Sequence, residues 1–294
     1  MSTPAFATLI KSAPALTVAR PKFVRHPLVR PNTKFLFDFT DARCWPNGII
    51  VPGALVAGAI FTDLAAGVTA TVVGTGVSAN SDGSLQFDGT SPVSGVRIGA
   101  AGQFDASAAP YKSLGGLWMK LPATGYTTTG YWAMMAAGSS YTDGQVNLDM
   151  GPGGVVPRTS IGTGTGGYTL ATAGGTAITA GVVYQLSTYF EAGAVLTLGL
   201  NGALNNTSTS PPATLQPNAA PKAMMLINAG KFTCYGAFLH DIGASIIAET
   251  VINTALVAAS KPPIASRTYL QHLLADYQFG TGALAPSAPK TAYA

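Results

Sequence analysis

Apolar and polar residues alternate with a period of two along most of the chain after residue 34, which is the pattern of a strand with one buried face. Clusters of Gly, Asn and Asp, such as those at residues 80–83 and 201–202, separate the runs and indicate turns. The pattern predicts eleven short strands, at residues 35–39, 69–73, 84–87, 93–98, 114–119, 131–135, 146–150, 182–190, 195–200, 224–227 and 233–239. Short strands separated by turns predict an all-β fold, a sandwich of two antiparallel sheets.

A helical period of apolar residues appears only near the end of the chain. The stripe consists of Tyr269, Leu270, Leu273, Leu274 and Tyr277, positions that share one face of a helix. We expect a C-terminal helical segment at residues 251–280 that packs on the sandwich of residues 35–250, and a Pro-, Ala- and Ser-rich tail at residues 281–294. Residues 244–260 fit either a second helix or a strand with a helical tail.

The first 34 residues differ in kind from the rest of the chain. They hold six of the 16 basic residues, no acidic residue and five prolines, and proline interrupts both helices and central strands. The pattern predicts an extended basic arm, which is either a solvated terminus or a segment that docks along a neighbouring protein. Docking is the preferred hypothesis, and the residues expected to make it are Arg20, Lys22, Arg25, Arg30 and Lys34.

Charge is scarce in the chain as a whole. Only 10% of the residues are charged and 47% are hydrophobic, whereas about 25% charged residues are usual in globular domains. This composition excludes a disordered chain and a coiled coil. Outside the arm, ten basic residues face 12 acidic ones, so we expect no nucleic-acid partner, and the arm is expected to dock into an acidic groove of a partner protein.

The most apolar window, residues 49–74, contains Pro52, Gly53 and Asp63, which argues against a membrane-spanning helix. No secretory signal pattern is expected in the first residues. Cys44 and Cys234 are too few for a disulfide framework, and we expect both to be free thiols.

A set of short motifs, taken in order, resembles a known family. The motifs lie at residues 84–89 (SLQFDG), 96–98 (VRI), 114–120 (LGGLWMK), 183–189 (VYQLSTY), 195–202 (VLTLGLNG) and 235–241 (YGAFLHD). Their order and spacing between residues 50 and 280 resemble laminin-G-like and concanavalin A-like jelly-roll domains. Residues 58–64 and the C-terminal helical stripe resemble the versions attached to tailed-phage virion proteins. The resemblance implies a jelly roll whose first and last strands pair, which would bring Cys44 and Cys234 towards each other.

The residues for glycoside hydrolysis are missing from the pattern. Retaining glycosidases need two carboxylates about 5 Å apart, and the glucanase branch of the family carries them as Glu-x-Asp-x-Glu on one strand. This sequence has only Glu191 and Glu249 as glutamates, and no such run. The GxGxxG match at residues 162–167 precedes no helix, so it is interpreted as a loop. We expect no catalytic residue, no cofactor and no enzymatic activity.

Sugar binding and calcium binding remain open on family grounds. Aromatic residues cluster between Gly125 and Thr142, and because Trp132 shares a strand face with core-like Met134, the surface candidates for stacking on a glycan are Tyr126 and Tyr141. Oxygen ligands for calcium could come from Asp143, Asn147 and Asp149. The sequence Asp143-Gly144 fits a hairpin turn equally well, and we favour that interpretation and predict no metal site.

The leading hypothesis is a non-enzymatic virion structural protein of a tailed phage, in a tail, baseplate, fibre or capsid-decoration position. It would be assembled in the host cytoplasm, dock through its N-terminal arm onto other virion proteins and form a homo-oligomer. The alternative is a carbohydrate-binding module that recognises host surface glycans. Neither hypothesis involves a membrane.

Overall fold

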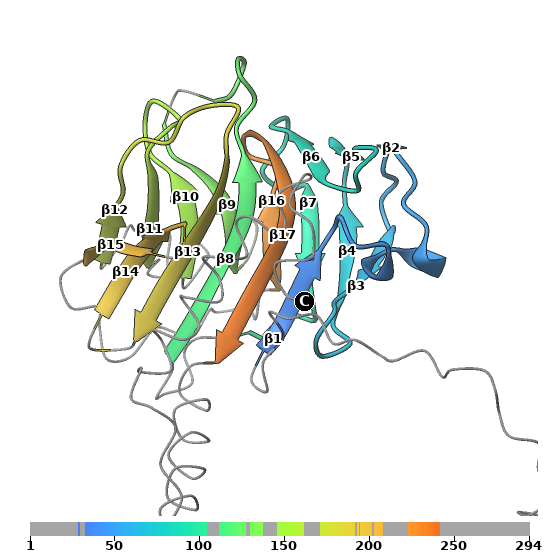
Figure 1. Cartoon of the computed structure of the whole chain (residues 1–294), viewed down its shortest axis with the longest axis horizontal. Coiled ribbons are helices and arrows are strands. Elements are labelled where there is room, and N and C mark those ends of the chain that lie inside the picture. Colours follow the sequence, from blue (N-terminus) through green and yellow to red (C-terminus); the bar gives the residue numbers. More distant parts are fainter. Residues whose placement is uncertain are drawn as a thin grey trace, which may run out of the picture.

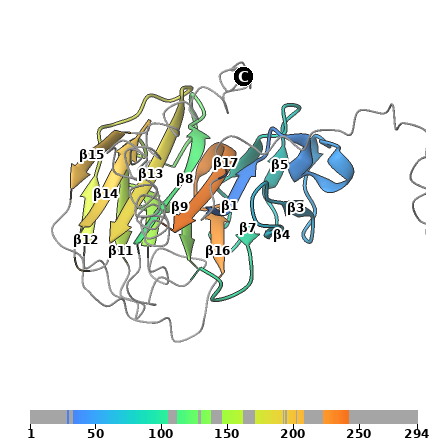
Figure 2. The ribbon, with the colours of Figure 1, turned by 60° about the horizontal axis from the view of Figure 1, so that its bottom comes forward.

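The computed structural model describes residues 29, 33–104, 112–127, 130–137, 146–161, 171–191, 193, 195–201, 203–207 and 223–241. Within them, two antiparallel sheets face each other (Figures 1 and 2). The first sheet has the order β15 (Ala203–Thr207), β14 (Val195–Leu200), β13 (Val183–Glu191), β8 (Lys112–Lys120), β17 (Lys231–Asp241), β6 (Leu85–Asp88), β5 (Val77–Ala79) and β2 (Gly53–Ala54), and β1 (Thr33–Asp38) also pairs with β17.

The second sheet has the order β12 (Ala171–Gly174), β11 (Pro157–Ile161), β10 (Val146–Met150), β9 (Trp132–Ala137), β16 (Met224–Ile227), β7 (Gly95–Ile98), β4 (Thr69–Val73) and β3 (Ile60–Thr62). Two short 3-10 turns, η1 (Ala42–Cys44) and η2 (Pro46–Gly48), follow β1. In Figure 1, β2 to β5 gather at one end of the sandwich and β10 to β15 at the other.

The predicted two-sheet antiparallel sandwich is confirmed. Each of the eleven runs with alternating polarity overlaps a strand, and the sequence missed β2, β3, β5, β11, β12 and β15. The missed strands are short or rich in Gly, Ala and Thr, so they carry too little alternation to stand out from loops. Lys34, assigned to the arm from the sequence, is the second residue of β1. The predicted C-terminal helical segment and tail lie outside the described residues.

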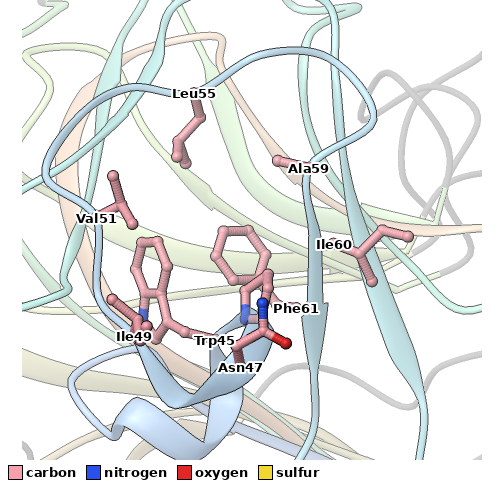
Figure 3. A pocket seen from close by; sticks show the side chains of 9 residues that line it. Trp45, Asn47, Ile49, Val51, Leu55, Ala59, Ile60 and Phe61 are labelled. Carbon is pink, nitrogen blue, oxygen red and sulfur yellow. The ribbon is translucent and has the colours of Figure 1, made fainter.

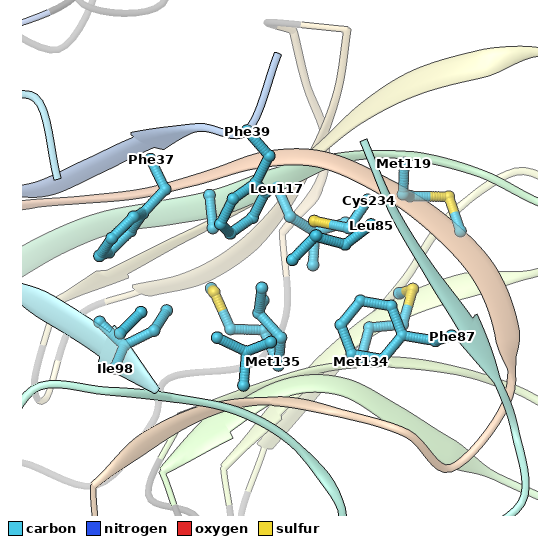
Figure 4. Packing of buried hydrophobic residues seen from close by; sticks show 14 of the residues in the cluster. Phe37, Phe39, Leu85, Phe87, Ile98, Leu117, Met119, Met134, Met135 and Cys234 are labelled. Atoms are coloured by element: carbon cyan, nitrogen blue, oxygen red, sulfur yellow. The ribbon is translucent and has the colours of Figure 1, made fainter. Parts of the chain in front are cut away.

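The core lies between the sheets and is rich in aromatic and sulfur-containing side chains (Figure 4). Phe35, Phe37 and Phe39 recur at every second position, and all three are fully buried. Phe37 stacks on Phe39 with ring centroids 5.8 Å apart. Burying each such side chain contributes about 1.5–3 kcal/mol, so β1 is a main contributor to the core.

Strand β17 is the central element of the first sheet. One of its edges pairs with β8, and its other edge pairs with β6 at Lys231–Cys234 and with β1 at Gly236–His240. A Cβ atom at Gly236 would meet the carbonyl oxygen of Phe37, and one at Gly116 in β8 would meet the carbonyl oxygen of Leu186. These glycines let neighbouring backbones approach closely, which explains why the strands tolerate them.

The pairing of β1 with β17 confirms that the first and last described strands are neighbours, as the resemblance implies. Cys44 and Cys234 are both buried free thiols. Burial raises the pKa of the Cys234 thiol to about 12 and also raises the pKa of Cys44. Both thiols are therefore protonated at neutral pH and poorly reactive.

An ion pair is buried on the outer side of the second sheet. Asp149 in β10 lies opposite Arg158 in β11; the Arg158 guanidinium donates to the fully buried Asp149 carboxylate, and the Ser160 hydroxyl donates to it at 2.9 Å. The guanidinium also lies 3.6 Å from the ring centroid of Tyr131. Burial raises the pKa of Asp149, and the Arg158 guanidinium opposes this shift. The Asp149 carboxylate, which the sequence offered as a calcium ligand, is therefore engaged within the second sheet.

We predict that Arg158→Met lowers the free energy of unfolding at pH 7 by about 3–5 kcal/mol, because it leaves a buried carboxylate without a counter-ion. The pKa of Asp149 then rises further in the folded state, so stability is lost as pH rises through that pKa and is regained at lower pH, where the carboxyl group is neutral. Urea unfolding of this variant at pH 4 and pH 7 measures the difference. Equal losses at both values would contradict the buried pair, and Asp149→Asn combined with Arg158→Met should remove the pH dependence.

Candidate functional site

An apolar groove lies at the end of the sandwich where β2 and β3 form the outer strands. We call it the edge groove; it has a volume of about 280 Å³ and its lining includes Trp45, Ile49, Val51, Leu55, Ile60 and Phe61. Figure 3 shows Ile49 and Val51 on one side, Ile60 on the other and the rings of Trp45 and Phe61 between them. The walls therefore come from the segment after η2 and from β3, and the floor is aromatic.

The turns after β1 build the floor of the edge groove. The Asp41 carboxylate caps η1 by accepting from the backbone N–H of Arg43 at 3.0 Å. The chain then turns through Asn47 and Gly48, which have positive φ values of 56° and 68°, a backbone conformation that favours Gly and Asn. These turns carry the chain back over its own aromatic residues and place Trp45 at the surface of the core.

Trp45 is held by one hydrogen bond and one ring contact. Its indole N–H donates to the carbonyl oxygen of Phe39 at 2.6 Å, and its ring meets Phe61 edge to face with centroids 4.9 Å apart. Phe61 in turn meets Phe39 at 5.3 Å. The groove floor is thus continuous with the aromatic core, so its shape is fixed before any ligand binds.

The rim of the edge groove is apolar and exposed. Of the seven large apolar side chains that are exposed in the described residues, four belong to this segment: Ile49 at 60%, Val51 at 60%, Val56 at 74% and Ile60 at 49%. No charged residue occurs between Cys44 and Thr62. A contiguous exposed apolar patch on a soluble protein indicates an interaction site. The window at residues 49–74, which the sequence singled out for its hydropathy, supplies this surface; no helix in the described part of the chain is long and apolar enough to cross a membrane.

The charged residues that flank this segment are already engaged. The Arg43 guanidinium lies 2.6 Å from the Asp41 carboxylate. Asp63, directly after β3, accepts from the backbone N–H groups of Val68 at 2.7 Å and Leu36 at 3.2 Å. Asp63 therefore ties the β3–β4 loop to β1 and holds the groove wall against the core.

Two open strand edges border the groove. Among the described strands, β2 pairs only with β5, and β3 pairs only with β4. In β3 the side chains of Ile60 and Thr62 are exposed and Phe61 is buried, and Ile60 and Phe61 line the groove. Open strand edges accept a further strand readily.

The residues proposed from the sequence for sugar binding do not form a described site. Tyr126 is half-buried and packs against the core cluster, and Tyr141 lies outside the described residues. Trp132 is buried in the core, as its spacing predicts. Tyr131 is the exposed aromatic residue of this region, at 42%. The sequence missed Tyr131 because it directly precedes a core strand and looked like part of it.

The arm residues are placed only in part. Lys34 lies in β1, and its ammonium group is 3.4 Å from the Asp241 carboxylate of β17. Arg20, Lys22, Arg25 and Arg30 lie outside the described residues.

The described residues offer no group that could hold a metal ion. In the described ranges no three His, Cys, Asp or Glu residues gather in a way that could hold a metal ion. Asn147 and Asp149 lie on β10, where Asp149 is engaged by Arg158, and Asp143 is outside the described residues. His240 is buried, and either ring nitrogen lies 3.3–3.4 Å from the Thr33 hydroxyl, a contact that joins β17 to the start of β1.

No family model and no curated protein matches this sequence. Among solved structures, the chain is similar to the botulinum neurotoxin serotype D binding domain (8% identity, TM-score 0.48, 71% of this chain and 48% of that one). It is also similar to the Trypanosoma rangeli sialidase in complex with 2,3-difluorosialic acid (13% identity, TM-score 0.44, 66% of this chain and 31% of that one). The chain therefore spans less than half the length of these structures, and likeness of this degree concerns the β-sandwich arrangement and assigns no activity.

We predict that Trp45→Ala lowers the free energy of unfolding by about 3–5 kcal/mol, the usual cost of removing a buried aromatic side chain. Trp45→Phe should lower it by about 1–3 kcal/mol, because a ring remains but the carbonyl oxygen of Phe39 loses its donor. Urea unfolding followed by far-UV circular dichroism measures both. No measurable loss for Trp45→Phe would show that the indole N–H bond does not hold the groove floor.

Proposed function

We propose that this chain is a non-enzymatic structural protein of a tailed-phage virion, in a tail, baseplate, fibre or capsid-decoration position, and that it docks on neighbouring proteins through the edge groove. The groove carries the proposal: it is preformed, apolar, uncharged and exposed. The virion setting rests on residues 58–64 and the helical stripe at residues 269–277, which resemble the versions of this jelly roll attached to tailed-phage virion proteins. The N-terminal arm, with Arg20, Lys22, Arg25 and Arg30, is proposed as a second tether.

The chemistry of the groove favours a protein partner. Interface cores are depleted in charged residues and enriched in aromatic ones, and the edge groove combines an aromatic floor of Trp45 and Phe61 with an aliphatic rim. A polar ligand would find few partners there, because Asn47 is the only polar side chain that lines it. The open edge of β3 offers backbone groups for strand addition.

The absence of an enzymatic role is part of the same proposal. The Asp149 carboxylate, the most deeply buried acid of the second sheet, is neutralised by Arg158. Glu191 is paired with Lys112 at 2.5 Å and accepts from the Tyr189 hydroxyl at 3.0 Å, and the Lys112 ammonium keeps the pKa of Glu191 below its usual value. A general acid needs a raised pKa, so Glu191 is unsuited to that role.

We expect Ile60→Asp to abolish docking while the fold persists. Ile60 is 49% exposed, so the substitution removes little core packing, whereas a carboxylate in an apolar interface is strongly disfavoured. Incorporation of the variant into particles, measured by quantitative mass spectrometry of purified virions, should fall at least tenfold.

Val182→Asp is the matched control, because Val182 is a 46% exposed residue directly before β13 and away from the edge groove. Both variants should keep the melting temperature of the parent chain within a few degrees. Normal incorporation of folded Ile60→Asp would refute the docking role of the groove.

Recognition of a surface glycan is the second candidate function, and Tyr131 is the observation that favours it. The Arg158 guanidinium lies over its ring, and the side chain stays 42% exposed, so a rigid aromatic surface is available for stacking on a sugar. Tyr126 is half-buried and is the weaker of the two described tyrosines for this role. One similar solved structure is a complex with 2,3-difluorosialic acid, and another concerns the dependence of botulinum neurotoxin type C cell entry on two ganglioside molecules. These ligands are those of the other proteins.

For this candidate we predict that Tyr131→Ala weakens binding to any glycan identified on an array at least tenfold, because the stacking surface is lost. Tyr126→Ala should have the smaller effect on affinity, and Ile60→Asp should have none. Isothermal titration with the purified saccharide measures the three variants. Equal affinity of the Tyr131→Ala variant and the parent chain would eliminate this site.

A further inference from the structure

The edge groove suits an extended, uncharged, apolar occupant. Its floor is aromatic, its rim is aliphatic, and no charged residue lies between Cys44 and Thr62 to attract a polar partner. The outer edge of β3 lies beside it, so an occupant in strand conformation would gain backbone hydrogen bonds as well as apolar contacts. A helical occupant would form its backbone hydrogen bonds internally, so the backbone groups on the outer edge of β3 would gain no partner.

The chain itself contains such a segment outside the described residues. Residues 5–10 (Ala-Phe-Ala-Thr-Leu-Ile) have neither charge nor proline, and they include one aromatic and two large aliphatic side chains. In an extended strand Phe6, Thr8 and Ile10 would share one face. The rest of the arm, from Lys11 onward, carries all of its charges and four of its five prolines, so residues 5–10 are the part of the arm whose chemistry matches the groove.

The connection to the sandwich is long enough to reach another molecule. Val29 is buried and precedes β1, and the stretch from Ile10 to Val29 can span about 60 Å when extended. The arm joins β1 at Thr33, whereas the groove floor is held at Phe39, after the other end of the strand. Strand geometry separates these ends by about 17–20 Å.

The prolines of the arm favour binding to the groove of a second copy over binding to the groove of the same molecule. Proline fixes its own φ near −65° and disfavours a helical conformation of the residue before it, so Pro14, Pro21, Pro27 and Pro31 favour an arm that extends away from the sandwich over one that folds back along β1 to the groove of the same molecule. An occupant from a second copy meets no such restriction.

We propose that residues 5–10 of one copy of this chain add as a strand to β3 and fill the edge groove of a second copy, so that the protein assembles by exchanging N-terminal arms. The inference rests on the docking function proposed above and names the partner of the groove. Reciprocal exchange between two copies gives a closed twofold dimer, whereas head-to-tail exchange gives a ring or an open filament.

A complementation experiment on full-length chains tests the exchange. Phe6→Asp disables the arm and leaves the groove intact, and Ile60→Asp disables the groove and leaves the arm intact. Each variant alone should sediment as a monomer at concentrations where the parent chain is oligomeric. The equimolar mixture should form a heterodimer, because one functional arm can fill one functional groove. Val182→Asp is the control and should self-associate like the parent chain.

Disulfide trapping is a second measurement, and it leaves Phe6 and Ile60 unchanged so that the apolar contacts between arm and groove can form. A chain with Thr8→Cys is mixed with a chain carrying Thr62→Cys, which places an exposed thiol in β3, and with one carrying Thr179→Cys, an exposed site away from the groove. After mild oxidation, intact mass spectrometry should show at least tenfold more cross-linked heterodimer for the Thr62 pair. Equal yields for the two pairs would overturn exchange between copies. A chain that carries both Thr8→Cys and Thr62→Cys is the second test, and a disulfide formed only within that chain would also overturn exchange.

The outcomes separate this inference from the docking function. If Phe6→Asp still self-associates and still enters particles while Ile60→Asp does neither, the groove binds another segment or protein, and only the arm exchange is wrong. If Ile60→Asp behaves like the parent chain in both measurements, the docking function fails, and the exchange fails with it.

Discussion

The pairing of β1 with β17 is the constraint on which the rest of the structure depends. It joins residues 33–38 to residues 236–240, so the chain must close a loop of about 200 residues before the sheet is complete. Close backbone approach at Gly236 makes this closure possible, and the phenylalanines of β1 complete the core. Closing a loop of this length costs conformational entropy, although the cost grows only slowly with loop length. The apolar area that β1 buries offsets this cost. Sandwiches of this kind therefore fold slowly and as a unit.

The same pairing determines where the molecule is left open. Because β17 pairs with β8, β6 and β1 together, the middle of the first sheet is paired, and the described outer strands of its main path are β15 at one end and β2 at the other. Strand β3 forms the corresponding edge of the second sheet, and the turns after β1 place Trp45 between them. An apolar groove at this position is a consequence of how the sandwich ends. Sheet edges are often blunted with charge or proline. Pro52 directly precedes β2, but no charged residue lies between Cys44 and Thr62, and this lack of charge is the observation on which the docking proposal rests.

The two ends of the sandwich differ in chemistry. At the β2–β3 end the surface is apolar and uncharged, whereas in the second sheet a buried ion pair of Asp149 and Arg158 lies beneath the exposed ring of Tyr131. The apolar surface at the β2–β3 end suits contact with another protein, and the exposed ring of Tyr131 is a small, rigid aromatic surface.

The sequence alone determined the fold class and most of the strands, because alternation of polarity is a local property that burial of one face imposes on each strand. It also indicated that Trp132 is a core residue and showed that the arm is rich in basic residues and free of acidic ones. The groove was invisible at that level: residues 49–60 have no alternation strong enough to predict β2, and their hydropathy suggested only that a membrane helix had to be considered. Tertiary structure decided that these residues remain exposed, because exposure depends on which strands become sheet edges, and that follows from the pairing of strands far apart in sequence. For the same reason only the structure could show that Tyr126 is half-buried and Tyr131 exposed, and that Arg158 engages Asp149 across two neighbouring strands.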